Sequence, residues 1–225
     1  MTPLRAALGG VLFLLAAVQY LLAETIAAAA WSSPPYDYAV NYISDLGVPG
    51  CGVAYSGREL CSPLFAVMNT GFVVDGVLFL LAAIVLAPAL TLRWRTAFLA
   101  AAALHTIGNV LVGLFDETTG SLMDGLPRTH VVGATLAILF GNVAAIVAGA
   151  WLVRSGRRWG VVAVLPGVVG AAAFIALAVG SFGLPEGAVE RVAVYSITAF
   201  ELLAGTVALT VGVRTAAGRR RGGVR

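Results

Sequence analysis

The sequence predicts an all-α integral membrane protein that crosses the bilayer with six helices. Sixty per cent of its residues are hydrophobic and 11% are charged, whereas a soluble domain has about 25% charged residues. The mean hydropathy of +0.94 is correspondingly high. Six apolar segments are each long enough to cross a hydrocarbon core of about 30 Å. We therefore expect one helical membrane domain over residues 1–225, with no room for a second domain.

The boundaries of the predicted spans follow from where the apolar runs begin and end. Ser62 and Pro63 are typical of an N-cap and a first helical residue, so the second helix should begin there. The six predicted spans are Ala6–Trp31, Pro63–Leu90, Trp94–Phe115, His130–Val153, Trp159–Gly180 and Gly187–Val213.

The distribution of arginine predicts the orientation of these spans. Because positively charged loops stay in the cytoplasm, we expect both termini inside the cell and the protein in the cell membrane. The pI near 9.2 then reflects short segments beside anionic lipid headgroups, and we expect no nucleic-acid partner. Eleven of the fourteen basic residues lie on the predicted cytoplasmic side, namely Arg5, Arg93, Arg95, Arg154, Arg157, Arg158, Arg214, Arg219, Arg220, Arg221 and Arg225.

The first predicted extracytoplasmic loop contains both cysteines. Cys51 and Cys61 are ten positions apart and would face an oxidising compartment, which favours a disulfide. Closing so short a loop would stabilise the fold by about 3 kcal/mol in the chain-entropy account. Two free thiols or a metal pair are the alternatives, although a zinc site would need more ligands nearby.

The same loop is expected to lie at the membrane surface or to fold back over the helix ends. Its tyrosines suit the interface between lipid and water. Ser44 and Asp45, followed by Gly47 and Pro49, are typical of a turn. Asp45 therefore has two interpretations, as a turn residue or as a functional group over the mouth of the bundle.

Several ionisable and amide side chains fall inside the first two predicted spans. Glu24 should lie about 10 Å below the outer end of its helix, Asn69 about 9 Å and Asp75 about 18 Å. A carboxylate in hydrocarbon is costly unless it is neutral, paired or facing water. Asp75 therefore needs a partner, and His105 at a similar depth is the obvious candidate; a neutral Asp75 bonded to a backbone carbonyl is the alternative.

Both histidines bracket one polar turn between the third and fourth spans. His105, Asn109, Val112 and Asp116 are spaced to share one helix face, and His130 opens the next span. We expect a histidine general base, His105 or His130, oriented by Asp45 or Asp116 if the protein is a hydrolase. The histidines are 25 positions apart, which matches no metal-binding motif, so no metal or cofactor is predicted.

The last three spans differ in polarity. The fourth carries small residues at every fourth position from Gly133 to Gly149, a pattern that lets another helix approach closely. This face is expected to pack within the bundle or against a membrane-protein partner or second copy. The sixth span contains Glu190, Arg191 and the deeply placed Glu201. Arg191 could hold Asp45, Asp116 or a lipid phosphate through its planar guanidinium.

Four stretches of the sequence resemble a known family. They are Asn41–Gly47, Ser62–Asn69, His105–Asn109 and His130–Gly133. Together they are similar to the bacterial and archaeal membrane family catalogued as domain of unknown function 998, which is distantly grouped with DRAM-like membrane proteins. The resemblance covers nearly the whole chain and implies a six-helix membrane fold. It implies neither an activity nor catalytic residues, so the candidate residues rest on their chemistry alone.

Three classes of function follow. The polar residues grade from a charged rim to a buried group, which favours an outward-opening cavity that binds, and could process or move, a membrane lipid or other amphiphile. A non-catalytic regulator or assembly partner is the first alternative, and a proton-linked transporter is the second. The candidate catalytic residues are His105, His130, Asp45 and Asp116, and the candidate binding residues are Glu24, Asn69, Asp75, Asn109, Glu190, Arg191 and Glu201.

Overall fold

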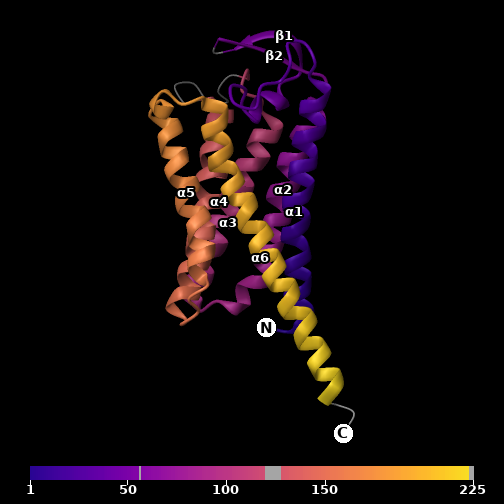
Figure 1. Ribbon diagram of the computed structural model, residues 1–225, viewed down its shortest axis with the longest axis vertical. Coiled ribbons are helices and arrows are strands. Elements are labelled where there is room, and N and C mark those ends of the chain that lie inside the picture. Colours follow the sequence, from indigo (N-terminus) through magenta and orange to yellow (C-terminus); the bar gives the residue numbers. More distant parts are fainter. Residues whose placement is uncertain (56, 120–127, 223–225) are drawn as a thin grey trace.

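The computed structural model describes residues 1–55, 57–119 and 128–222 (Figure 1). Within them, six helices are long and apolar enough to cross a membrane. The polar turn predicted between the third and fourth spans lies largely outside the described residues, as does Arg225. The helices are α1 (Pro3–Ala30), α2 (Phe65–Leu86), α3 (Leu92–Leu114), α4 (Thr129–Arg154), α5 (Gly160–Ala178) and α6 (Glu186–Gly222).

The six predicted spans agree with these helices, with one correction at the C-terminal end. The predicted sixth span ends at Val213, but α6 continues to Gly222. Hydropathy marks only where the apolar stretch stops, whereas the following segment of Ala, Thr and Arg still has adequate helix propensity. In Figure 1 this extension carries α6 beyond the ends of the other helices.

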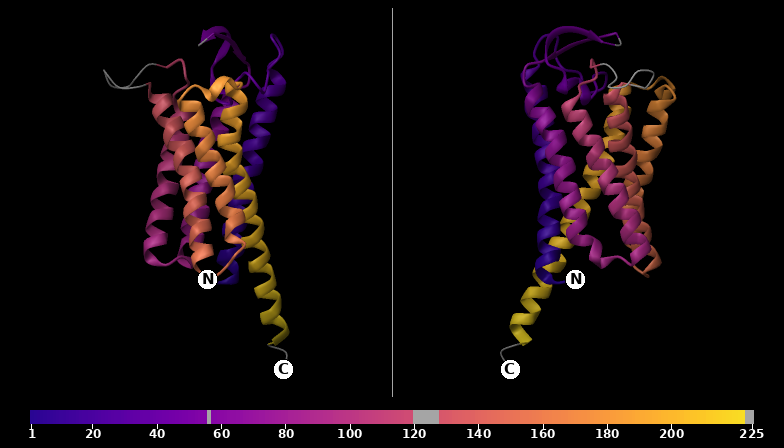
Figure 2. Two further views of the ribbon diagram at one scale, coloured as in Figure 1. Left: turned by 60° about the vertical axis from the view of Figure 1, so that its left-hand side comes forward. Right: turned by 180° about the vertical axis from the view of Figure 1, so that it is seen from behind.

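The helices form a ring in which each packs against its neighbours in the sequence, and α6 closes the ring against α1. Figure 2 shows this arrangement from two further directions. The chain runs alternately up and down, so the ends of α1 and α6 near the termini lie together, which we call the terminal end. Helix α5 has the least buried membrane-length stretch of the six, and it packs mainly on α4 and α6.

The small residues of α4 allow this close packing. An added Cβ at Gly133, Gly141 or Gly149 would lie 2.5–2.8 Å from side chains of α3, α6 and α5, respectively. The chain's own helices therefore cover this face. A partner protein or second copy stays a prediction, and it would have to bind elsewhere. The five residues of the face are all buried: Gly133, Ala137, Gly141, Ala145 and Gly149.

Three phenylalanines form an aromatic layer across the middle of the bundle. Phe13 of α1 lies edge-on to Phe79 of α2, with ring centroids 5.1 Å apart, and edge-on to Phe200 of α6 at 5.7 Å. All three are almost fully buried. Edge-to-face contacts of this kind add to the energy of burial, and the layer closes the bundle core at this depth.

The opposite end of the bundle, which we call the hairpin end, is covered by the loop between α1 and α2. This loop contains two antiparallel strands, β1 (Gly50–Tyr55) and β2 (Arg58–Ser62), preceded by a short 3-10 helix, η1 (Ser44–Gly47). The all-α prediction is therefore correct for the membrane part and incomplete here. Strand pairing was missed because Gly50 and Gly52, both with positive φ, weaken the alternation typical of a strand.

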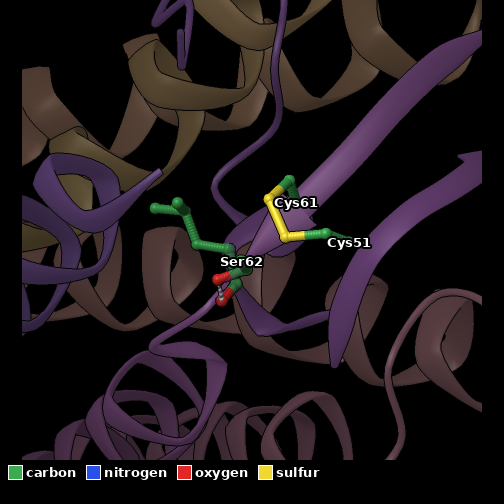
Figure 3. The surroundings of a disulfide bond; sticks show 4 residues. Cys51, Cys61 and Ser62 are labelled. Carbon is green, nitrogen blue, oxygen red and sulfur yellow. Dashed lines mark hydrogen bonds between the residues drawn. A yellow bond between two sulfur atoms is a disulfide. The ribbon is translucent and has the colours of Figure 1, made fainter. Parts of the chain in front are cut away.

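The predicted disulfide is present, and it joins directly paired positions of the two strands, Cys51 and Cys61 (Figure 3). The predicted role of Ser62 as an N-cap is wrong. Ser62 ends β2, and its hydroxyl donates to the carbonyl oxygen of Leu46 at 2.6 Å. The serine hydroxyl therefore fastens η1 to the sheet, and α2 begins at Phe65 without a side-chain cap.

The tightest helix contact yields a stability prediction. A Cβ at Gly108 of α3 would lie 2.2 Å from the backbone nitrogen of Ala137 on α4. Gly108→Ala should therefore force the two helices apart and cost about 1–3 kcal/mol, the usual range for overpacking. We expect a lower apparent melting temperature of the detergent-solubilised protein. Gly218→Ala, where no atom lies within 4 Å, is the control, and equal melting temperatures for the two variants would contradict this packing.

Candidate functional site

A polar cavity lies inside the bundle between its middle and the hairpin end. Its volume is about 40 Å³, and one water molecule requires about 10–15 Å³, so a few waters fit. The walls come from α1, α2, α3, α4 and α6, and the segment before η1 covers it. The polar residues that line the cavity are Tyr20, Ser44, Asp75, His105, Asn109, His130, Glu190, Thr198 and Glu201.

His105 lies near the floor of this cavity in defined contacts. Its Nδ1 is 2.7 Å from the carbonyl oxygen of Ala137, so Nδ1 must carry a hydrogen. Its Nε2 is 3.0 Å from the side-chain nitrogen of Asn109 and 3.5 Å from the carboxylate of Asp75. Gly141 permits this position, because a Cβ there would approach the ring to 2.8 Å. The predicted pairing of Asp75 with His105 agrees with this geometry.

Glu201 extends the group from the facing helix α6. Its carboxyl faces the carboxyl of Asp75, and two carboxyls in such contact favour a proton on one of them. Among the described residues, no N–H or O–H donor reaches the buried Oε1 of Glu201. We call the group Asp75, His105 and Glu201 the buried triad.

His130 and Glu190 line the cavity nearer its cover. The Nδ1 of His130 lies 2.8 Å from the carbonyl oxygen of Phe115. The carboxylate of Glu190 accepts a hydrogen bond from the backbone N–H of Ile43, in the segment that covers the cavity. These two titratable side chains lie between the buried triad and the hairpin end.

Arg191 does not contact the predicted partners Asp45 or Asp116. Its guanidinium instead pairs with Glu24 of α1 at 3.2 Å and donates to the carbonyl oxygens of Tyr38 and Asn41, each at 2.7 Å. Sequence analysis missed this pairing because Glu24 lies on a helix 167 positions away. Arg191 is buried with its hydrogen bonds committed, so it holds α1, α6 and the loop together.

Asp45 also has a structural partner, on the sheet. Its carboxylate accepts two hydrogen bonds from Arg58, at 2.9 and 2.8 Å, and Glu117 lies 3.5 Å from the same guanidinium. Burial opposes ionisation of Asp45, but contacts with Glu117, Arg58 and Asn41 outweigh it and lower the pKa of its carboxyl. Burial and the nearby Asp45 raise the pKa of Glu117 to about 10. This cluster fastens η1 to β2 and to the end of α3.

Asp116 lies outside the cavity. Helix α3 ends at Leu114, so the helical periodicity that would align Asp116 with His105 does not reach it. Its carboxylate accepts hydrogen bonds from the backbone and hydroxyl of Thr118 and from Thr119. Burial alone would raise the pKa of Asp116, but these hydrogen bonds lower it. The residue stabilises a turn.

One protein-family model matches most of the chain. The family described as "Protein of unknown function (DUF998)" matches residues 14–207. The chain belongs to the DUF998 family. Neither the curated proteins nor the solved structures contain a significant match to it. Family membership agrees with the resemblance seen in the sequence and leaves the function to be argued from the site.

The DUF998 chain thus brings together some predicted site residues and separates others. Five lie outside the cavity because they hold the loop, the turn or neighbouring helices: Glu24, Asp45, Asn69, Asp116 and Arg191. Asn69, for example, donates to the carbonyl oxygen of Gly47 at 2.9 Å. Six line the cavity: Asp75, His105, Asn109, His130, Glu190 and Glu201.

Three polar residues of the cavity wall were missed. Tyr20 lies one helical turn from Glu24 on α1, and Thr198 lies three residues before Glu201 on α6, so helical spacing from a predicted residue could have found both. Ser44 was assigned only to a turn. A hydroxyl group changes the hydropathy of a segment little, so hydropathy marks the charged residues and not these three.

The arrangement does not bring the predicted hydrolase residues together. A histidine general base would need a carboxylate to orient it, and Asp45 and Asp116 are engaged elsewhere. Asp75 contacts His105, but the same acid is shared with Glu201. Across residues 1–55, 57–119 and 128–222, no group of three His, Cys, Asp or Glu side chains is placed to hold a metal ion.

Glu117 gives the DUF998 chain a pH-dependent stability. Folding raises its pKa from about 4.5 to about 10, so between these values the folded state binds a proton that the unfolded state lacks. The free energy of unfolding should therefore fall as the pH rises through this window. Glu117→Gln removes the titrating proton and should flatten the fall. Thermal unfolding in detergent at several pH values measures the slope.

Glu59→Gln, an exposed change on β2 next to Arg58, is the matched control and should keep the wild-type slope. Asp45 acts in the opposite direction at acid pH, because its lowered pKa stabilises the fold above its unfolded pKa and this is lost as the pH falls through the folded value. A slope unchanged by Glu117→Gln would show that Glu117 is ionised in the folded protein.

Proposed function

We propose that this DUF998 protein is a proton-linked membrane transporter in which the buried triad is the proton-binding site. The observation that carries the proposal is the convergence of Asp75, His105 and Glu201 from three helices on one small cavity. Ionisable side chains at this depth in a membrane are costly, and their usual roles include proton relays. A proton shared by two carboxyls and an imidazole can be released or taken up with small movements of the helices.

The size of the cavity supports this proposal over amphiphile binding at the same place. The sequence favoured a lipid in the polar cavity, but about 40 Å³ is far below the 300–1,000 Å³ or so of a site for a drug-sized ligand. The transported solute would be small and polar. A non-catalytic regulator remains the alternative, and it would share the fold without needing a titrating cavity.

We propose that protons reach the buried triad from the hairpin end. His130 and Glu190 lie on that side, and each is a group that can accept and pass on a proton. On the other side, the aromatic layer of Phe13, Phe79 and Phe200 packs directly below, with Phe79 and His105 centroids 4.5 Å apart. A dry layer of this kind stops a water chain, so access in this conformation is one-sided.

The transporter proposal predicts proton flux into liposomes. Wild-type protein, driven by a potassium diffusion potential, should acidify the lumen faster than protein-free liposomes, as read by an enclosed pH-sensitive dye. Glu201→Gln and Asp75→Asn should each reduce the flux to the protein-free level, because each removes a carboxyl that shares the proton. Asp116→Asn lies outside the cavity and should retain the wild-type flux.

Folding of each variant is verified by its elution profile and melting temperature in detergent. Wild-type protein that is folded and gives no flux above protein-free liposomes would remove proton conduction through the buried triad and favour the regulator. Equal loss in Asp116→Asn would show that the assay reports damage to the fold rather than the buried triad.

We further propose that both termini lie in the cytoplasm, on the basis of the arginine distribution. A green fluorescent protein fused after Arg225 should fluoresce, and alkaline phosphatase fused there should be inactive. Alkaline phosphatase inserted at Gly57, between the strands, should be active because the hairpin would face the oxidising side. The reverse pattern of activities would place the cavity access on the cytoplasmic side.

A further inference from the structure

A second cavity lies at the terminal end of the bundle, below the aromatic layer. Its volume is about 180 Å³, and its walls are apolar except for one charged side chain, that of Arg157. Phe13 and Phe200 form its inner wall, and Trp151 and Ala204 line it further out. None of these residues takes part in the polar cavity.

This second cavity opens to the surface at the terminal end, where the lining residues Trp159 and Val211 are exposed. Close-packed cores leave few voids larger than a water molecule, and an apolar cavity of about 150 Å³ stays free of water and binds a molecule such as benzene. An apolar space of this size in a membrane protein therefore favours an apolar occupant over water. The bilayer supplies one at high concentration, the acyl chain.

The position of the cavity gives such a chain a route of entry. Its walls come from all six helices, and they include Ala163 of α5 and Ala204 of α6. In Figures 1 and 2, α6 is inclined to the other helices and diverges from α5 toward the terminal end. Residues on the outer side of α5, such as Val168, are exposed at the surface that would meet lipid.

Charge at the rim indicates which lipid would bind. Arg157 lines the cavity, and its neighbours Arg154 and Arg158 are exposed beside it. The segments that make the terminal end (1–12, 84–104, 148–164 and 202–222) contain no Asp or Glu. An arginine guanidinium binds phosphate through two parallel hydrogen bonds, and tryptophans such as Trp159 are typical of the interface beside lipid headgroups.

We infer that this second cavity is a binding site for an anionic phospholipid. One acyl chain occupies the apolar space between α5 and α6, and the headgroup phosphate pairs with Arg157. The inference is independent of the transporter proposal, because it uses a different cavity and different residues. The sequence predicted an amphiphile ligand. This inference places that ligand at the end of the bundle opposite the polar cavity.

Native mass spectrometry tests this site. Wild-type protein is released from nanodiscs that contain equal amounts of phosphatidylglycerol and phosphatidylcholine. We expect one tightly retained lipid, with phosphatidylglycerol in about fivefold excess, the ratio that corresponds to one arginine near an anionic lipid. Arg157→Gln should lower this excess, whereas Arg93→Gln, an exposed change at the same end but outside the cavity, should leave it unchanged.

A cavity-filling variant tests the place of the chain. Ala204→Phe should remove the retained lipid, and Val168→Phe, which adds the same bulk to the outer surface of α5, should retain it. Ala148→Leu fills the cavity from α4 and serves if Ala204→Phe does not fold. No retained lipid on wild-type protein, equal retention of the two lipids, or full retention in a folded cavity-filling variant would each overturn the inference.

Discussion

The arrangement of this bundle depends on the cost of an ionisable side chain in hydrocarbon. The acids buried in the helices have specific counterparts: Glu24 pairs with Arg191, and Asp75 contacts both His105 and Glu201. Glu190 accepts a hydrogen bond from the backbone of the loop that covers the bundle. A charge without such a partner would be unfavourable by several kcal/mol. These contacts therefore determine which faces of the helices must meet, and the apolar residues complete the packing around them.

Hydropathy predicts the helices because it depends only on neighbouring residues in the sequence. The contacts between helices depend on residues that are far apart in the sequence. The six spans agree with the structure, and the depth of Asp75 and His105 correctly indicated that they meet. The partner of Arg191 could not be predicted, because Glu24 is distant in sequence and three other anions fitted equally well. Asp116 was misplaced for a different reason, since helical periodicity cannot tell that α3 ends at Leu114.

In the loop at the hairpin end, too, the sequence predicts local features but not contacts between distant segments. Cysteine spacing was sufficient to predict the disulfide between Cys51 and Cys61. The contacts of Asp45 with Arg58 and Glu117, in contrast, bring together the loop, the sheet and the end of α3. These contacts hold the loop over the polar cavity. They join segments that are not related by any helix or strand repeat in the sequence. Sequence reasoning identified Asp45 as important there without finding its partners.

The aromatic layer separates two compartments of opposite character, and α6 contributes to both through adjacent residues. Phe200 forms part of the wall of the apolar cavity, and Glu201 lines the polar one. Because these side chains share one backbone, a rotation of α6 that withdraws Glu201 from Asp75 also displaces Phe200 from Phe13. Under the two proposals above, a lipid that holds α6 in place would slow proton release from Glu201, and membrane composition would then affect the chemistry of the bundle interior.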